Sequence, residues 1–526
     1  MFHLKGSLFL MVALIVATAA VCRPVEASTE TEDVTFEIKT FSVEGNTVLA
    51  ERDLNRLLET FTGDGKTAAD VEAARDGLER FYHQNGYPTV LVNIPEQTVD
   101  HGLVSLQVIE SRIRRVRVTG NKYHTMESIR RHLPSLSSGE ILYLPKIRRE
   151  LARANRVPDL QVAPVLAPGR ELGSIDVELK VEDRLPLHGS IELNNRSSHD
   201  TTPMRLNGSI RYDHLWQLEH SLSLQFQASP QDWSEVKVFS GSYSLPAPWQ
   251  DDHLLSFYYI YSDSATATGD GFSVIGRGKI AGARYVMGLP PVERYQHNIT
   301  LGIDHKDFKE DQAGEEKPIA YTPATVGYAS SMADEFGTTQ FSASVNLLFR
   351  EVFSDPSSQF EAKRNGSRGN YIYFTGGIER RQKLPLDAGL FVKLDGQIAD
   401  QPLINNEQYA GGGVGNVRGF KAAEVLGDNA IHATIEVNSP EWRQLFDLKG
   451  NWSMTPYVFY DVANLHVIDA LPEQTPNFFL AGTGFGVEGG IWGNTYYKLD
   501  WGYALESTGN TASGENRFYY QMRYVF

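Results

Sequence analysis

The chain has 526 residues, with 49 Lys and Arg against 65 Asp and Glu, which gives a net charge of −16 at pH 7. This acidic balance argues against nucleic acid as the main partner. A mean hydropathy of −0.31 excludes a bundle of transmembrane helices, because each span needs about 20 apolar residues. The 46 glycines, 24 tyrosines and 26 phenylalanines favour a strand-rich protein.

The N-terminus has the features of a secretory signal peptide over residues 1–27. A positive charge precedes an apolar run at residues 8–20, and residues 25–27 (Val-Glu-Ala) follow as a cleavage site. Cys22, the single cysteine, would leave with this segment, so no disulfide and no cysteine-held metal site is expected in the mature chain. The alternative, a lipidated Cys22, is disfavoured by Val21, a poor residue before a lipidated cysteine.

A repeat follows. Residues 41–46 (Phe-Ser-Val-Glu-Gly-Asn) recur as residues 116–121 (Val-Arg-Val-Thr-Gly-Asn), an offset of 75 residues. In both copies a short alternating strand ends at Gly-Asn, which suits a turn, and helical and then strand patterns follow. The order β-α-α-β-β predicts two tandem α+β modules over residues 34–111 and 112–184. The expected helices are 50–60, 67–84, 125–133 and 144–155, and the expected strands are 89–94, 103–110, 160–166 and 174–181.

From residue 186 to residue 526 helical periodicity disappears, and alternating segments separated by Gly, Pro, Asn and Asp take over. A soluble β-sandwich also alternates. The number of segments, the charged residues on the inward face and the aromatic strand ends favour an outer-membrane barrel instead. About 16 strands of roughly 10 residues each fit this length. The predicted fold is therefore an all-β transmembrane barrel of about 16 antiparallel strands, preceded by the two modules.

One motif stands out in the predicted barrel. Residues 411–429 read GGGVGNVRGFKAAEVLGDN and belong to an inward-folding loop, residues 400–429, between strands 11 and 12. Taken alone, the motif could be a flexible glycine-rich surface loop. A phosphate-binding loop is excluded, because no Gly-Lys-Ser/Thr follows and the glycines do not fit G-x-G-x-x-G. Arg418, if folded into the lumen, needs a carboxylate partner, because a desolvated lone guanidinium is costly. Asp461, two strands further along, is the candidate.

Together these features resemble the two-partner secretion transporters of the outer membrane, that is, the TpsB or haemolysin secretion/activation family (ShlB/FhaC/HecB type) of the POTRA-barrel superfamily. The specific element is VRGF followed by EVLGDNA, with an aromatic C-terminus. The resemblance implies that Arg418 and Asp461 latch the loop to the barrel wall. Ala463 stands where the family's F-x-D-x-G motif has glycine. The loop-motif residues are Val417, Gly419, Phe420, Glu424, Gly427, Asp428 and Asn429, and the residues of the C-terminal barrel signal are Phe518, Tyr520, Tyr524 and Phe526.

The resemblance implies a translocator and not an enzyme. Its POTRA modules, in the periplasm, would recognise an unfolded exported partner protein, and the barrel would pass that partner to the cell surface. Expected partners are a large β-helical passenger, outer-membrane lipid and the barrel-assembly machinery during biogenesis. No nucleic acid, cofactor or metal is expected. The alternative is a POTRA-barrel insertase that assembles outer-membrane proteins, but such insertases usually carry more than two modules.

Two further expectations concern the pore and its polar residues. Many members of the family begin with a helix that plugs the pore, but here only about six residues separate residue 27 from the first module strand. We therefore expect no plug helix, with residues 411–429 as the main internal obstruction. The fourteen histidines are scattered and are interpreted as polar residues of the rim or lumen.

A basic region contrasts with the acidic chain. Residues 111–156 hold 12 Lys and Arg against 3 Asp and Glu. One interpretation is an electrostatic guide for an acidic passenger. A second is contact with anionic groups at the inner leaflet, and the plainest is a solvated face. The candidate guide residues are Arg114, Arg117, Arg130, Arg131, Arg148 and Arg149.

Overall fold

The computed structural model describes residues 34–157, 159–199, 201–250, 252–264, 266–269, 272–290, 292–312, 315–349 and 355–526. The predicted signal peptide, and the stretch in which no plug helix is expected, lie outside the described residues. The chain divides into two units, one of residues up to 120 with 129–182, and one of residues 121–128 with 183–526. Among the described residues, no helix combines the length and the apolar character that a membrane crossing requires.

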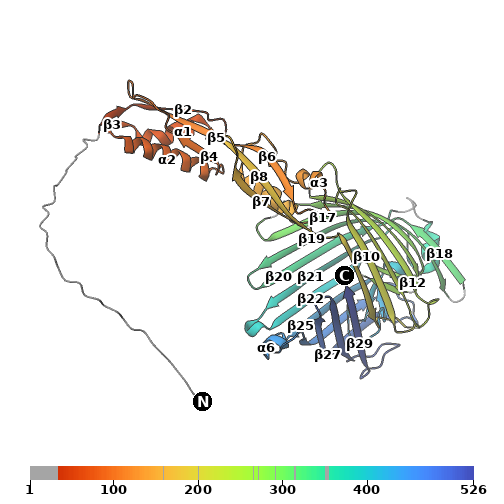
Figure 1. Cartoon of the computed structure of the whole chain (residues 1–526). Helices are drawn as coiled ribbons and strands as arrows, with labels where there is room; N and C mark the ends of the chain where they lie inside the picture. The colour runs from red at the N-terminus through yellow and green to blue at the C-terminus, as the bar shows by residue number, and fades with distance from the viewer. Residues whose placement is uncertain are drawn as a thin grey trace, which may run out of the picture. The chain divides into compact units, whose positions relative to one another are not determined.

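The first unit contains two small α+β modules, each with a three-stranded sheet and two α-helices (Figure 1). In the first module the strand order is β2-β5-β4, with β2 parallel to β5, and in the second it is β6-β8-β7, with β6 parallel to β8. The predicted helices and strands are confirmed within a few residues. The short strands β1 and β3 pair as a separate two-stranded sheet that the sequence patterns did not predict.

The elements of the first module are β1 (Phe36–Ile38), β2 (Thr40–Glu44), α1 (Glu51–Leu58), η1 (Glu59–Phe61), β3 (Gly63–Lys66), α2 (Ala68–Gln84), β4 (Val90–Asn93) and β5 (Leu103–Glu110). Those of the second are β6 (Arg112–Thr119), α3 (Met126–Arg131), α4 (Leu144–Ala154), β7 (Leu160–Pro168) and β8 (Ser174–Asp183).

The start and the buried face of α2 follow from its sequence. Thr67 precedes the helix, and its backbone N–H donates to Asp70 Oδ2 at 2.8 Å, which satisfies one of the amides near the helix start. Apolar residues at helical spacing then form one buried stripe on the sheet. The stripe consists of Val71, Ala74, Leu78 and Tyr82.

The two modules share the turn that the Gly-Asn repeat predicts. Gly45 and Gly120 have φ values of +85° and +89°, and a Cβ on either would lie 2.3 Å from a backbone carbonyl oxygen. Glycine meets both requirements. The next residues, Asn46 and Asn121, each donate from Nδ2 to the carbonyl oxygen three residues later, at 2.8 Å in both copies. The repeat in sequence is therefore a repeat in structure.

The second unit contains a closed antiparallel barrel, in which each strand pairs with its neighbour in the chain and β29 pairs back with β9 (Figure 1). The strands β18 and β19 both pair with the long β17 and act as one, so the barrel has 16 strands, as predicted. Its strands are β9 (Leu187–Asn194), β10 (Arg205–Leu215), β11 (His220–Ala228), β12 (Lys237–Pro246), β13 (His253–Asp263), β16 (Gly278–Gly288), β17 (Tyr295–Gln312), β18 (Glu315–Tyr321), β19 (Ala324–Asp334), β20 (Gly337–Leu347), β21 (Ile372–Lys383), β22 (Gly389–Ala399), β25 (Asn429–Asn438), β26 (Thr455–His466), β27 (Asn477–Ile491), β28 (Thr495–Ala504) and β29 (Asn516–Val525).

Short elements lie in the connections between the barrel strands. Two hairpins are formed by β14 with β15 and by β23 with β24. These elements are β14 (Thr266–Gly269), β15 (Phe272–Ile275), α5 (Ser357–Lys363), η2 (Pro385–Asp387), η3 (Asn405–Glu407), β23 (Tyr409–Gly411), β24 (Val425–Gly427) and α6 (Trp442–Leu445).

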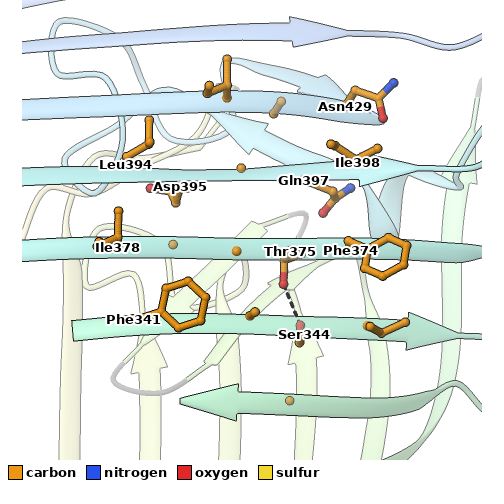
Figure 2. Close-up of a pocket in the computed structure, with 18 of the residues that line it drawn as sticks. Phe341, Ser344, Phe374, Thr375, Ile378, Leu394, Asp395, Gln397, Ile398 and Asn429 are labelled. Carbon is orange, nitrogen blue, oxygen red and sulfur yellow. Dashed lines mark hydrogen bonds between the residues drawn. The ribbon is translucent and has the colours of Figure 1, made fainter. Parts of the chain in front are cut away.

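The outer wall of the barrel is apolar and carries a groove of about 940 Å³ across β20, β21 and β22 (Figure 2). Its floor is formed where Gly376 pairs with Gly396, and Phe341 and Phe374 stand on opposite sides of it (Figure 2). Phe374 is 54% exposed, as expected of a side chain that faces lipid. This pocket therefore belongs to the outer surface and not to the lumen.

Candidate functional site

The loop between β22 and β25 packs its tip inside the barrel. These are strands 11 and 12, so the loop lies where the sequence places it. Val417 and Phe420 are fully buried. They belong to an apolar cluster with wall residues from three strands, so the tip is held against the inner wall by its own side chains. The wall residues are Ala463, Leu465, Leu480 and Ala504.

Arg418, between those two apolar residues, makes the most extensive polar contacts of the tip. Its Nε and Nη2 donate to the two oxygens of Asp461 at 2.7 and 2.8 Å, and its backbone N–H donates to Asp461 Oδ2 at 3.1 Å. The guanidinium carbon lies 3.4 Å from the ring centroid of Phe459. Arg418 is 2% exposed and Asp461 is fully buried. This is a bidentate, charge-assisted ion pair, and its two hydrogen bonds fix the orientation of the guanidinium against the carboxylate.

Asp461 is one of three carboxylates around this arginine. Arg418 Nη1 also donates to Glu436 Oε1 at 2.6 Å and lies 3.5 Å from Asp500 Oδ1. Burial lowers the pKa of Arg418, but the hydrogen bonds to Asp461 and the charges of Asp461, Glu436 and Asp500 raise it above the ordinary arginine value. The guanidinium therefore stays charged, and the wall carries more negative charge than this one arginine neutralises.

Glycines in the wall make room for the tip. A Cβ on Gly482 of β27 would lie 1.9 Å from the carbonyl oxygen of Arg418, and one on Gly502 of β28 would lie 2.7 Å from the amide nitrogen of Gly419. Gly419 itself has a φ of +105°, in the region that favours glycine. The loop backbone can approach the wall this closely because these positions carry no side chain.

The last barrel strand contributes two inward side chains. The hydroxyl of Tyr519 accepts from the N–H of Gly419 at 2.9 Å and donates to the carbonyl oxygen of Phe420 at 2.7 Å. Arg517 Nε donates to the carbonyl oxygen of Gly419 at 3.0 Å. Neither residue was predicted from the sequence. Both residues hold the backbone of the VRGF motif. Contacts of this kind to backbone atoms leave no pattern in the sequence.

Glu424 joins the loop to two other connections. Its Oε2 lies 2.6 Å from His199 Nε2, in the connection after β9, and its Oε1 accepts from Thr508 Oγ1, in the connection before β29. Burial raises the pKa of Glu424, but the hydrogen bonds from Thr508 and His199 lower it by more. The pKa therefore lies below the ordinary glutamate value. The loop is thus tied to the first and last connections of the barrel.

Asp428 is the second charged anchor of the loop. It is fully buried and pairs with Arg364, which follows α5 in the connection between β20 and β21. Asp428 also accepts the N–H groups of Leu403 at 2.9 Å and Ile468 at 2.7 Å, and the side-chain amide of Gln408 at 3.1 Å. The sequence motif contained Asp428, but Arg364 was not predicted.

A second segment also packs inside the barrel. Phe360 of α5 is fully buried in an apolar cluster with inward residues such as Phe308 and Tyr371. Beside it, Glu407 accepts hydrogen bonds from Lys306 Nζ at 2.5 Å and from Tyr373 Oη at 2.8 Å. The expected obstruction at residues 411–429 is therefore accompanied by α5. The sequence feature that could have indicated this second obstruction is the long connection between β20 and β21, which exceeds the length of a simple turn.

The other predicted site residues occupy the following positions. Gly427 ends β24, and Asn429 starts β25, where its Oδ1 accepts the N–H of Ala399 at 2.8 Å. Phe518 of β29 and Phe526, which follows that strand, are exposed on the outer face. Tyr520 and Tyr524 belong to the same outward register. The continuous pairing of Ala463 with both neighbouring strands shows that alanine in place of the motif's glycine leaves the strand regular.

The predicted basic residues lie on β6, α3 and α4 of the second module. Arg114 pairs with Asp176, with Nε 2.9 Å from Oδ1, so part of the positive charge is neutralised. Arg130 is exposed and donates to the carbonyl oxygen of Val116 at 2.7 Å. The remaining candidates are exposed, namely Arg117, Arg131, Arg148 and Arg149.

Comparisons with known proteins cover nearly the whole described chain. Residues 36–111 match the POTRA domain of the ShlB type, and residues 173–489 match the family described as haemolysin secretion/activation protein ShlB/FhaC/HecB. The outer membrane transporter CdiB of Dickeya dadantii is 23% identical over 453 residues, which cover 80% of this chain and 75% of the relative. The heme/hemopexin transporter protein HuxB of Haemophilus influenzae is 18% identical over 386 residues, which cover 70% of this chain and 66% of the relative.

Two solved structures show the same fold. CdiB from Escherichia coli superimposes with a TM-score of 0.63 at 20% identity, covering 96% of this chain and 93% of that one. BamA from Haemophilus ducreyi lacking POTRA domains 1–3 gives a TM-score of 0.55 at 14% identity, covering 93% and 100%. The barrel with its preceding modules is therefore an architecture shared by transporters and by BamA.

Proposed function

The chain belongs to the haemolysin secretion/activation family of the ShlB/FhaC/HecB type, and on this premise we propose that it exports one partner protein through its barrel after the POTRA modules bind that partner unfolded. Members of the family are transporters of the outer membrane, with their POTRA domains in the periplasm. The observation that carries the proposal is the charged loop tip, which lies inside a closed barrel and is held against its inner wall by an ion pair and an apolar cluster.

The modules offer a way to bind an unfolded chain. In the first module β2 and β4 are the sheet edges, and in the second β6 and β7 are the edges. An extended peptide can add to such an edge through main-chain hydrogen bonds, which give affinity without demanding one sequence. The exported partner would therefore dock as an added strand. The simpler alternative, in which the modules are a passive spacer, predicts that their removal leaves export unchanged.

The exposed arginines of the second module support an electrostatic guide for an acidic partner. Arg117, Arg148 and Arg149 are exposed and sit in a region where Lys and Arg outnumber Asp and Glu. Attraction between exposed charges weakens with salt, because ions screen it over about 10 Å at 0.1 M. Charge reversal at these residues should slow export in proportion to the acidity of the partner. Export that ignores both salt and charge reversal would argue for a merely solvated face.

The lumen opens when the loop tip leaves the wall. Withdrawal of Arg418 exposes the carboxylates of Asp461, Glu436 and Asp500, which gives a polar, hydrated lining for an extended polypeptide. The periplasm holds no nucleoside triphosphate pool, and the chain has no P-loop. We therefore assign the driving force to folding of the passenger, a large β-helical protein, outside the cell.

Deletion of residues 28–182, with the signal peptide retained, tests the docking role. We expect the barrel to reach the membrane while the exported partner accumulates in the periplasm. Undiminished export would show that the modules are a spacer.

The rival function is insertion of other outer-membrane proteins, which the fold shared with BamA favours. The same deletion strain separates the two functions. An exporter leaves the levels of unrelated outer-membrane proteins unchanged. A general fall in those levels, with export of the partner maintained, would support the insertase instead.

A further inference from the structure

Three histidines stand at corresponding places in the barrel, each beside a tyrosine of the next strand. His220 Nδ1 lies 2.5 Å from Tyr243 Oη, and His253 Nδ1 lies 2.6 Å from Tyr285 Oη. The third pair joins His297 Nδ1 to Tyr328 Oη at 3.2 Å. The proposed transport function uses none of these residues, and sequence analysis left the histidines as scattered polar residues.

The register shows that the three pairs are one repeated arrangement. In each hairpin the tyrosine pairs with the residue two positions after the histidine, so the histidine and the tyrosine face each other diagonally across the two strands. These register pairs are Leu222↔Tyr243, Leu255↔Tyr285 and Ile299↔Tyr328. The same atoms, Nδ1 and Oη, meet each time.

All three pairs face lipid at the periplasmic edge of the barrel. They share the outward register with exposed side chains such as Phe257 and Ile303. The strand β9 follows the second module directly in the chain, so β11, β13 and β17 also start at the periplasmic end. The turns there carry exposed tryptophans, Trp216 at 72% and Trp249 at 63%, which mark the level of the lipid head groups.

The hydrogen bonds indicate which imidazole nitrogen carries the proton. His297 Nε2 lies 3.3 Å from the carbonyl oxygen of Pro290, which can only accept, so Nε2 is the donor and Nδ1 receives the Tyr328 hydroxyl. Trp249 Nε1 donates to Tyr285 Oη at 3.0 Å, which leaves the Tyr285 proton for His253 Nδ1. In this tautomer the Nε2–H of His253 and of His297 is a hydrogen-bond donor, and we infer the same tautomer for His220 because its Nδ1 meets a tyrosine hydroxyl in the same arrangement.

For two of the histidines this donor faces the membrane interface. Within the described part of the chain, no hydrogen bond is seen at Nε2 of His220 or His253. The acceptors available at this depth of a membrane are the phosphate and glycerol oxygens of phospholipids. Glu219 and Asp252 precede these histidines in the turns, so recognition there depends on directed donors and not on net positive charge.

We propose that the His220–Tyr243 and His253–Tyr285 pairs form two head-group sites that bind the phosphate of phospholipids in the periplasmic leaflet, whereas the Nε2–H of His297 already donates to Pro290. Each tyrosine hydroxyl orients its imidazole, and the imidazole N–H donates to a phosphate oxygen while the acyl chains lie on the apolar wall above. The sites distinguish a phospholipid from a lipid without phosphate. They do not distinguish phosphatidylethanolamine from phosphatidylglycerol.

Lipid binding to the purified full-length protein in non-ionic detergent tests this proposal without using export. After delipidation, the probe is dimyristoyl phosphatidylglycerol or phosphatidylethanolamine, and the control is dimyristoylglycerol, which has the same chains. Native mass spectrometry counts bound lipid. We expect both phospholipids, and not the diacylglycerol, to bind the wild type, and His→Leu changes at 220 and 253 to weaken each site about tenfold, as loss of a hydrogen bond to a charged group does.

Two further variants make the test specific. His466→Leu removes an exposed histidine at the opposite end of the barrel, bonded to Asn477 at 2.8 Å, and should leave binding unchanged. The double Tyr→Phe variant at 243 and 285 keeps the rings and should weaken binding by releasing the imidazoles. Equal binding of diacylglycerol, full displacement by inorganic phosphate, or unchanged binding by the double histidine variant would overturn the proposal.

Discussion

Two charged anchors hold the loop between β22 and β25, and they are built differently. At the tip, Arg418 of the loop faces three carboxylates of the barrel wall. At the end of the loop, Asp428 receives Arg364 together with two backbone N–H groups and a side-chain amide. A charge with alternative partners can move between them, whereas a carboxylate enclosed by fixed donors cannot. The comparison indicates that the base of the loop is fixed and that the tip is the part that moves.

The largest effect is expected from Asp428→Ala. This change leaves Arg364 buried without its carboxylate, and breaking a buried pair in this way costs about 3–5 kcal/mol. We expect a lower unfolding temperature of the purified barrel and less protein in the outer membrane. Glu473→Ala, which removes an exposed carboxylate from the connection after β26, is the control and should behave as the wild type. A stable Asp428→Ala protein would mean that the base of the loop is not fixed.

The next largest effect is expected from Arg418→Ala, and it should appear in transport more than in stability. The change leaves three carboxylates of the wall without their cation and removes the attraction that holds the tip there, while water in the lumen reduces the cost below that of Asp428→Ala. We expect lower export and altered conductance in planar bilayers. Arg418→Lys keeps the charge but loses the bidentate geometry, so its export and conductance should lie between those of the wild type and those of Arg418→Ala. Wild-type export and conductance in Arg418→Ala would contradict the latch.

A smaller effect of the same kind is expected from Asp461→Ala. Glu436 and Asp500 remain near the guanidinium, so Arg418 keeps part of its stabilisation. The conductance change should resemble that of Arg418→Ala and be weaker. Adding Glu436→Gln to Asp461→Ala should bring the conductance of the double variant closer to that of Arg418→Ala, because neighbouring changes are not additive. If Asp461→Ala alone equals Arg418→Ala, the extra carboxylates have no role and the contrast between tip and base fails.

The sequence predicted the tip better than the base, and the reason is physical. The family resemblance that the VRGF motif carries implies that Arg418 lies in the lumen, and a lone buried guanidinium requires an acid, so Asp461 could be named in advance. Alternation also fixes which residues face inward, and the 16-strand barrel follows from segment count and length.

The rest depends on how long connections fold against each other. Arg364 follows a short helix in one connection, and His199 lies in another, and neither has a spacing that relates it to residues 400–429. Their partners are chosen by three-dimensional packing, which no local pattern encodes. Tyr519 was not predicted for a different reason. The recognisable signal of β29 is its outward aromatic residues, whereas Tyr519 faces inward and holds the loop backbone.

The smallest effect is expected at Glu424. It tests whether His199 and Thr508, which lie in two other connections, also hold the loop. Burial raises its pKa, but hydrogen bonds from Thr508 and His199 bring the value below that of an ordinary glutamate, so folding favours the ionised form. The stability that this carboxylate adds is therefore complete above the ordinary glutamate pKa and is lost as the pH falls through the lowered value. Glu424→Gln should reduce stability by about 1.5–3 kcal/mol at neutral pH.

That difference between wild type and Glu424→Gln should shrink in acid, as thermal unfolding across a pH series would show. The Asp428→Ala protein measured in the same series supplies the comparison. If the Glu424→Gln deficit were equally large at neutral and acidic pH, its origin would be packing and not charge. His199 and Thr508 would then be neighbours of the loop without being anchors.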